Sequence, residues 1–284
     1  MQQPKVLVLI GYGINCDYET QFAFQKAGAI ADRVHINEII DGTYKLEDYE
    51  VFFVPGGFSY GDELGAGKVL ANKLRINLEE QLQQFIEDEK LIGGHCNGAQ
   101  VLIKSGILPA INGNYKIQTA TLTNNDSGRY EDRWINLKSI SKTCVWTSDL
   151  PTMCMPVAHG EGKFYSKEPG LIEELKKDEN RQIALVYIKP DGSPANRKFP
   201  YNPNGSVADI AGICDPTGRI FLQMPHPERY THLTNHPQWT RIVGDIKRER
   251  RKLGLPIDLD KIDWEGEGLL IFRNAVNHAI EELV

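Results

Sequence analysis

Cysteine is scarce in this sequence, and the few cysteines form no pattern. The 284 residues include five, at positions 16, 96, 144, 154 and 214, and no two of them make a CxxC pair. An odd and widely spaced set predicts reduced thiols rather than a disulfide framework. The lack of paired cysteines also argues against a structural zinc site. We therefore expect a protein of a reducing, cytoplasmic compartment.

Long hydrophobic runs and an excess of positive charge are missing as well. The clean apolar run nearest the N-terminus covers residues 6–10, far below the roughly 20 residues of a membrane-spanning helix. The residues before it lack the pattern of a signal peptide. Lys and Arg number 32 against 38 Asp and Glu, which gives a net charge of −6. The sequence thus predicts no membrane segment and no general nucleic-acid-binding surface.

Phosphate-binding motifs are present only in fragments. The Gly-Tyr-Gly at 11–13 follows an apolar run, but Cys16 stands where a dinucleotide fingerprint has its third glycine. Residues 65–69 resemble a phosphate loop in part, yet the first glycine is misplaced and no Ser or Thr follows the lysine. We expect no ATP site in this chain. A nucleotide-binding or regulatory module that uses residues 11–13 stays an alternative.

Apolar runs alternate with helical patterns through the N-terminal two-thirds of the chain. Strand-like runs at 6–10, 51–54 and 91–92 end in glycine-containing turns, and helical patterns follow at 18–27, 77–88 and 99–104. This repetition predicts an α/β fold with a mainly parallel sheet covered on both faces. Further strands are expected at 119–122, 134–140, 155–158, 183–187, 208–214 and 220–224, a loop at 189–205 and a last helix at 269–283. No clear linker divides the chain, so residues 1–284 are predicted to form one domain.

The strongest local signal is the segment Gly94-His95-Cys96-Asn97-Gly98. A short apolar strand precedes it and a helical pattern follows, as in nucleophile elbows, with Cys in place of Ser. The two glycines leave room for a tight strand-to-helix turn. Such a turn puts the Cys96 sulfur at a helix N-terminus, where the dipole favours the thiolate, and aims the Asn97 N–H at a developing oxyanion. A buried structural thiol is the alternative, and it is the interpretation we adopt for the other four cysteines.

A nucleophilic cysteine needs a base and a group that orients the base, and His226-Pro227-Glu228 offers both. The segment follows the strand expected at 220–224. A proline after His226 favours an extended backbone, and in an extended segment residues two apart project to the same side. Glu228 can therefore reach the His226 ring and hold its tautomer. A histidine on the surface or at a cap is the alternative.

Two further segments are candidates to line the same site. Residues 55–62, which read PGGFSYGD, follow the strand at 51–54, and sites in open α/β sheets gather at such strand ends. A glycine N–H there could be a second oxyanion donor, with a plain turn as an equal alternative. His159 opens a turn-like Gly-Glu-Gly segment. His226, His232 and His236 match no common zinc spacing, so no metal site is predicted.

Five segments together resemble class I glutamine amidotransferases of the cysteine-histidine-glutamate type. They are residues 56–62 (GGFSYGD), 96–100 (CNGAQ), 159–164 (HGEGKF), 201–206 (YNPNGS) and 225–229 (PHPER). The cysteine and His-Pro-Glu motifs are typical of the whole superfamily. GGFSYGD and YNPNGS are far more specific to one group, the glutaminase subunits of phosphoribosylformylglycinamidine synthase of de novo purine biosynthesis. The resemblance spans most of residues 5–230.

The resemblance implies a flavodoxin-like, three-layer α/β sandwich and roles for particular residues. By resemblance the catalytic residues are Cys96, His226 and Glu228, the oxyanion donors are Gly57 and Asn97, and the residues beside the bound glutamine are Phe58 and Gln100. The family usually has an aliphatic residue where His95 stands. Residues 233–264 look like an insertion before the last helix. They contain the basic run 247–252, which we interpret as a solvated helix face, with a docking surface as the alternative.

The resemblance also implies partners. Ammonia from glutamine would pass to a separate large synthetase subunit that binds ATP, Mg²⁺ and formylglycinamide ribonucleotide, and a small third subunit is common in the split form of this enzyme. The present chain would need no cofactor of its own. Two other classes stay open: a stand-alone cysteine hydrolase or amidase that is fully active without a partner, and a scaffold whose triad has lost its activity.

Overall fold

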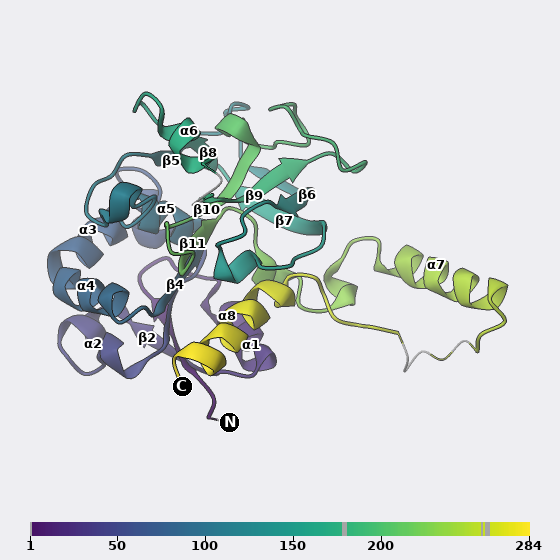
Figure 1. The fold of residues 1–284 in the computed structure, drawn as a ribbon, viewed down its shortest axis with the longest axis horizontal. Helices are drawn as coiled ribbons and strands as arrows, with labels where there is room; N and C mark the ends of the chain where they lie inside the picture. Colours follow the sequence, from purple (N-terminus) through teal and green to yellow (C-terminus); the bar gives the residue numbers. More distant parts are fainter. Residues whose placement is uncertain (1, 178–180, 257, 259–261) are drawn as a thin grey trace.

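A nine-stranded sheet organises the computed structural model, which describes residues 2–177, 181–256, 258 and 262–284 (Figure 1). The strand order is β2-β1-β3-β4-β11-β10-β9-β6-β7. These strands are β1 (Lys5–Ile10), β2 (Ile30–His35), β3 (Val51–Val54), β4 (Leu91–His95), β6 (Glu131–Ser139), β7 (Met153–His159), β9 (Ile183–Ile188), β10 (Ile210–Cys214) and β11 (Ile220–Gln223). A small second sheet pairs β5 (Thr121–Thr123) with β8 (Lys163–Tyr165).

The large sheet has a parallel half and an antiparallel half. The strands β2, β1, β3, β4 and β11 are parallel neighbours, whereas the pairs from β11 through β10, β9 and β6 to β7 are antiparallel. The carboxyl ends of β1, β3, β4 and β11 therefore meet at one edge of the sheet. In such sheets, ligands bind outside these ends.

Helices cover both faces of the parallel half. On one face lie α1 (Asp17–Ala27) and α8 (Leu269–Glu282), and on the other lie α2 (Ile36–Ile40), α3 (Lys68–Asn77), α4 (Glu79–Glu87) and α5 (Asn97–Lys104). Each face of the sheet has its own hydrophobic core, and successive side chains of a strand point to opposite faces. In β1, Leu7 and Leu9 pack on the α5 side, and Val6 and Val8 pack on the α1 side. The predicted three-layer α/β sandwich is confirmed.

Two departures from the predicted elements have simple causes. The helix predicted at 77–88 is α4, but the separate helix α3 before it, which begins at Lys68 just after Gly67 with its left-handed φ of 74°, was not predicted. The pair β2 and α2 was not predicted. β2 lies at the edge of the sheet, and its sequence IADRVH lacks the continuous apolar run of a central strand. The other predicted strands and helices are confirmed within a few residues.

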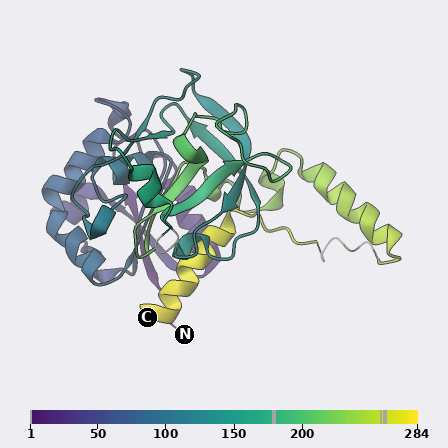
Figure 2. The ribbon, with the colours of Figure 1, turned by 45° about the horizontal axis from the view of Figure 1, so that its top comes forward.

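The helix α7 (Trp239–Lys252) carries the basic run and projects away from the sheet (Figures 1 and 2). Its apolar side packs on Leu233 and Ile262 in a small separate cluster. The helical interpretation of the basic run is therefore confirmed. The assignment of 1–284 to one domain, and of 233–264 to an insertion, stays a prediction; residues 1, 178–180, 257 and 259–261 lie outside the described part. Among the described helices, none is long and apolar enough to cross a membrane.

Candidate active site

Cys96 sits at the turn between β4 and α5 in a strained conformation. Its φ of 50° and ψ of −110° are unusual for a residue with a Cβ, and such strain costs on the order of 1–3 kcal/mol and gathers at functional sites. The flanking glycines make the turn possible. A Cβ on Gly98 would lie 1.8 Å from the Val54 carbonyl oxygen, and one on Gly94 would lie 2.9 Å from a Leu102 methyl carbon. The predicted elbow geometry is confirmed.

The turn leaves the Cys96 sulfur almost buried beside a cavity. The residue is 6% exposed, and its Sγ lies 3.5 Å from the carbonyl oxygen of Ala158. The residue stands at the N-terminal end of α5, whose first N–H groups and dipole favour a negative charge. This surrounding suits a thiolate nucleophile.

His226 and Glu228 are in direct contact at the end of β11. The His226 Nδ1 lies 2.6 Å from Glu228 Oε1, and both side chains are at most 1% exposed. The local structure differs from the prediction, because Pro227–Arg229 form a 3₁₀ turn rather than an extended segment. Pro227 occupies the first position of this turn, where its fixed φ and missing N–H are favourable. The turn brings the carboxylate back to the ring that precedes it.

The pair holds opposite charges at neutral pH. Burial opposes the charge on His226, but the carboxylate of Glu228 and the neighbouring Cys96 raise the pKa of His226 well above its usual value. Burial likewise opposes the charge on Glu228, yet His95, His226 and Arg229 lower the pKa of that carboxyl to about 2. The His226 Nε2 has no hydrogen-bond partner among the described residues. The surroundings of His226 thus favour its protonated form, and the sulfurs of Cys96 and Cys16 lie close to its ring.

Two side chains that the sequence did not place in the site lie beside this pair. The ligand-type atoms of Cys16, His95, His226 and Glu228 all lie within 4.8 Å of one another. Arg229 donates from Nη2 to the Cys16 sulfur at 3.3 Å. Cys16, interpreted as a structural thiol, is indeed buried but belongs to the site. It directly follows the loop at the end of β1, so the strand-end rule could have found it.

The same four side chains are the one candidate metal cluster in the described part of the chain. Cys16 already accepts from the Arg229 guanidinium, and Glu228 is bonded to His226. A cation there would compete with both contacts, so we assign no metal to it. His232 and His236, considered as ligands together with His226, are not members of the cluster.

A cavity of about 460 Å³ opens in front of Cys96. Among the residues predicted for the site, Gly57, Phe58 and Gln100 line it, whereas Asn97, His226 and Glu228 do not. Phe58 is 44% exposed and stacks on Tyr130 with ring centroids 6.3 Å apart. The cavity is large enough for a small amide substrate whose reacting group reaches the sulfur.

The loop that carries Gly57 is fixed against the residues after β1. Ile14 forms a bridge with Gly57, and Phe58 donates its N–H to the Gly13 oxygen at 2.7 Å. A Cβ on Gly57 would lie 2.6 Å from that same oxygen, so only glycine fits. Within the described residues, no hydrogen bond uses the Gly57 N–H, and Asn97 opens a helix whose first N–H groups have no partner inside the helix.

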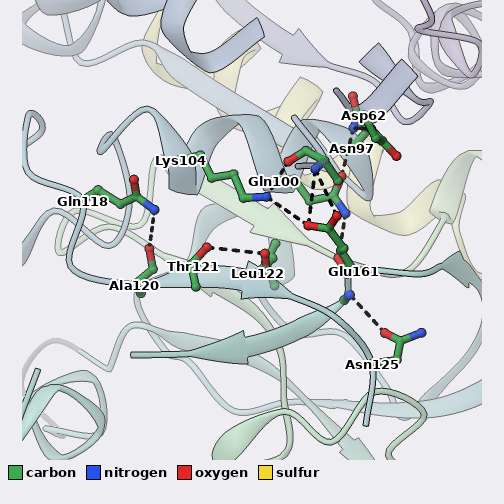
Figure 3. Close-up of polar contacts among 12 residues, drawn as sticks. Asp62, Asn97, Gln100, Lys104, Gln118, Ala120, Thr121, Leu122, Asn125 and Glu161 are labelled. Atoms are coloured by element: carbon green, nitrogen blue, oxygen red, sulfur yellow. Dashed lines mark hydrogen bonds and ion pairs between the residues drawn. The ribbon is translucent and has the colours of Figure 1, made fainter. Parts of the chain in front are cut away.

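A polar network lies along the wall of the cavity that Asp62, Gln100 and Glu161 line (Figure 3). Asn97 donates from Nδ2 to Gln100 Oε1 at 2.9 Å and lies 3.3 Å from Asp62 Oδ1, and Gln100 donates to the Glu161 carbonyl at 2.6 Å. Lys104 lies 3.2 Å from the Glu161 carboxylate. Gln100 is thus held by protein groups at both ends of its amide. Asp62 and Glu161 lie within the motifs of the sequence but were not singled out there.

His159 lines the cavity, as its segment was expected to do. Its Nδ1 lies 3.1 Å from Asn125 Oδ1, and the same oxygen accepts the Gly162 N–H. Burial lowers the pKa of His159 to about 3, so the ring is neutral. We find no reason in this geometry to give His159 a proton-transfer role.

Comparison with known proteins shows the family to which this chain belongs. Residues 3–279 match the family model of the CobB/CobQ-like glutamine amidotransferase domain, and the chain belongs to this family. Two curated relatives are named phosphoribosylformylglycinamidine synthase subunit PurQ. The protein from Methanococcus maripaludis strain S2 is 46% identical over 97% of both chains, and that from Dehalococcoides mccartyi is 42% identical over 98% of this chain and 99% of its own. A chain of the PurLQS structure from Thermotoga maritima matches with a TM-score of 0.69 and 25% identity, over 98% of this chain and 99% of that one.

Proposed function

We propose that this chain is the glutaminase subunit of phosphoribosylformylglycinamidine synthase. It hydrolyses glutamine to glutamate and ammonia, and it supplies the ammonia for the ATP-dependent conversion of formylglycinamide ribonucleotide to formylglycinamidine ribonucleotide. One observation carries the chemistry. A cysteine on a strained elbow lines a cavity, and a buried His–Glu pair, 2.6 Å apart, has its imidazole close to the cysteine sulfur. The names of the relatives support phosphoribosylformylglycinamidine synthase as the enzyme to which this subunit belongs.

The positions of these groups support the following reaction. The Cys96 thiolate attacks the side-chain amide carbon of glutamine, and the carbonyl electrons move to the oxygen, where the N–H groups of Gly57 and Asn97 stabilise them. His226 gives its proton to the amide nitrogen, and the C–N bond breaks to release ammonia and leave a glutamyl thioester. Water then attacks the thioester while His226 takes its proton, and glutamate leaves with recovery of the thiolate. Glu228 keeps the imidazole oriented throughout.

The wall formed by Asp62 and Glu161 fits the α-ammonium group of glutamine. Burial and, after it, the nearby Glu161 carboxylate raise the pKa of Asp62, and Lys104 opposes this shift only in part. A bound ammonium would relieve the repulsion between the two carboxylates. Arg129 also lines the cavity and suits the α-carboxylate. Charges of both signs thus match a zwitterionic amino acid.

The variant Asp62→Asn tests this recognition with little change to the backbone. Asp62 has a φ of 56°, which asparagine tolerates as well as aspartate does. Loss of a hydrogen bond to a charged group predicts a rise in KM for glutamine of about 10- to 100-fold, with a smaller change in kcat. Glutaramate, which lacks the α-amino group, should be turned over equally by the variant and the native protein. An equal loss on both substrates would contradict the assignment; Asp88→Asn, on the surface at the end of α4, is the matched control.

The partners are the large synthetase subunit and a small third subunit, and glutamine is the substrate of this chain. We place ATP and Mg²⁺ on the synthetase subunit and no cofactor on this chain. We place the complex in the cytoplasm, where the five scattered thiols would stay reduced.

Reconstitution with the synthetase subunits tests the proposed function. Formation of formylglycinamidine ribonucleotide from glutamine should require this chain, whereas formation from ammonium salts should not. We expect little glutamine hydrolysis by the chain alone and clear stimulation by its partners. Full hydrolysis without partners, together with no glutamine-dependent synthesis, would instead identify a stand-alone amidase.

A further inference from the structure

His95 is a buried histidine that the reaction described above does not use. It is the last residue of β4 and directly precedes Cys96, and it is 0% exposed. Its ring packs against Phe53 and His226, with centroids 5.2 and 5.4 Å away. In the described part of the chain, neither of its ring nitrogens has a hydrogen-bond partner. A buried polar ring in this state is costly unless a contact compensates it.

Glu228 has a buried carboxylate oxygen that lacks a hydrogen-bond donor. Its Oε1 is bonded to His226 and lies 3.6 Å from Arg229 Nε, but its Oε2 has no hydrogen-bond partner among the described residues. The nitrogen that approaches this oxygen is His95 Nε2, at 3.3 Å. The two atoms are at ion-pair distance without hydrogen-bond alignment. Catalytic hydrogen bonds are often long or poorly aligned before substrate binds.

The protonation state of His95 suits a donor. Burial lowers the pKa of His95 to about 4, although Glu228 acts in the opposite direction. The ring is therefore neutral at pH 7 and carries one N–H. A carboxylate can only accept, so the tautomer with the hydrogen on Nε2 is favoured beside Glu228.

We propose that His95 is a positioning residue whose Nε2–H holds the second oxygen of Glu228, so that the first oxygen stays on His226. This inference rests on the proposed function, because it acts through the same His–Glu pair. It extends the site to a row of four side chains, Cys96, His226, Glu228 and His95. A carboxylate held at both oxygens cannot turn away from the imidazole when the proton moves.

Three substitutions separate this role from simple packing. His95→Leu removes the donor, His95→Gln keeps an amide N–H near the Nε2 position, and His95→Asn places it near the Nδ1 position. We expect kcat for glutamine hydrolysis by the reconstituted complex to fall about 10- to 100-fold in the Leu and Asn variants. The Gln variant should recover most of this loss. KM should stay within about 2-fold of the native value in each variant, because His95 does not line the cavity.

The pH profile supplies a second signature. The groups that face Glu228 and His95 are Cys16, His226 and Arg229, and the variants leave all three in place. A less firmly held Glu228 raises the pKa of His226 less, so the alkaline limb of kcat should move to lower pH in the Leu and Asn variants. In the Gln variant it should return toward its native position.

Nuclear magnetic resonance tests the proposal without activity. In protein labelled with nitrogen-15 in histidine, the His95 ring, assigned by its loss in His95→Asn, should stay neutral with its hydrogen on Nε2 from pH 6 to 9. A hydrogen on Nδ1, or a native kcat and pH profile in His95→Leu, would overturn the proposal. Equal losses in the Gln and Asn variants would do the same. A native complex that hydrolyses no glutamine would instead overturn the proposed function itself.

Discussion

A Cys96→Ala variant should lose glutamine hydrolysis by on the order of 10⁶-fold, the scale seen when the nucleophile of a triad enzyme is removed. The reason is that no other group in the cavity can form the acyl intermediate. The Cys16 sulfur accepts a hydrogen bond from Arg229 and does not line the cavity. The measurement is glutamate release by the reconstituted complex under saturating glutamine.

Two controls make this loss specific. The complex that contains Cys96→Ala should still make product from ammonium salts, because ammonia bypasses the glutaminase. Cys154→Ala, at a half-buried position of β7 that does not line the cavity, should keep native activity. Retention of more than about 1% of glutamine hydrolysis by Cys96→Ala would be inconsistent with Cys96 as the nucleophile.

Replacement of Glu228 by Gln should lower kcat by on the order of 10⁴-fold, as loss of the orienting carboxylate does in related triads. The new side chain would be nearly the same size as the native one but uncharged, so it would no longer favour the imidazolium. Its amide N–H would also favour the wrong tautomer of His226. The matched control is Glu87→Gln on the exposed surface of α4, for which we expect no change.

The residual activity of Glu228→Gln should also shift with pH. Burial lowers the pKa of His226, and Glu228 and Cys96 together raise it well above the usual value. Without the carboxylate, burial is opposed less and the pKa of His226 falls. The alkaline limb, where His226 loses the proton that ammonia needs, should therefore move to lower pH. A limb that stays in place would mean that another group supplies the proton.

The local turn around Cys96 could be predicted because its determinants are adjacent in the sequence. Gly94 and Gly98 are needed where an added Cβ would collide with Leu102 or Val54, and such spacing can be recognised without coordinates. The contact between His226 and Glu228 was predicted correctly, but from an extended backbone conformation that the structure does not have. Both an extended segment and a 3₁₀ turn can bring residues two apart together, so the prediction held although its geometry did not.

The contacts that could not be predicted join residues far apart in the chain. His95 meets Glu228, and Cys16 meets Arg229, because β1, β4 and β11 end at the same edge of the sheet. The order of the strands in the sheet creates these contacts, and no single segment of the sequence determines that order. The strand β2 was not predicted for a related reason. It lies at the edge of the sheet and pairs with one strand only, so its sequence needs no continuous apolar run.

Covalent trapping is the most direct test of the assignment of Cys96 as the nucleophile of a glutaminase. The complex would be incubated with the electrophilic glutamine analogue diazo-oxo-norleucine, and the adduct would be located by peptide mass spectrometry. We predict one adduct, on Cys96, whose formation is blocked by excess glutamine. Cys96 that stays unlabelled with the synthetase partners and ATP present, or label on Cys16 in its place, would contradict the assignment.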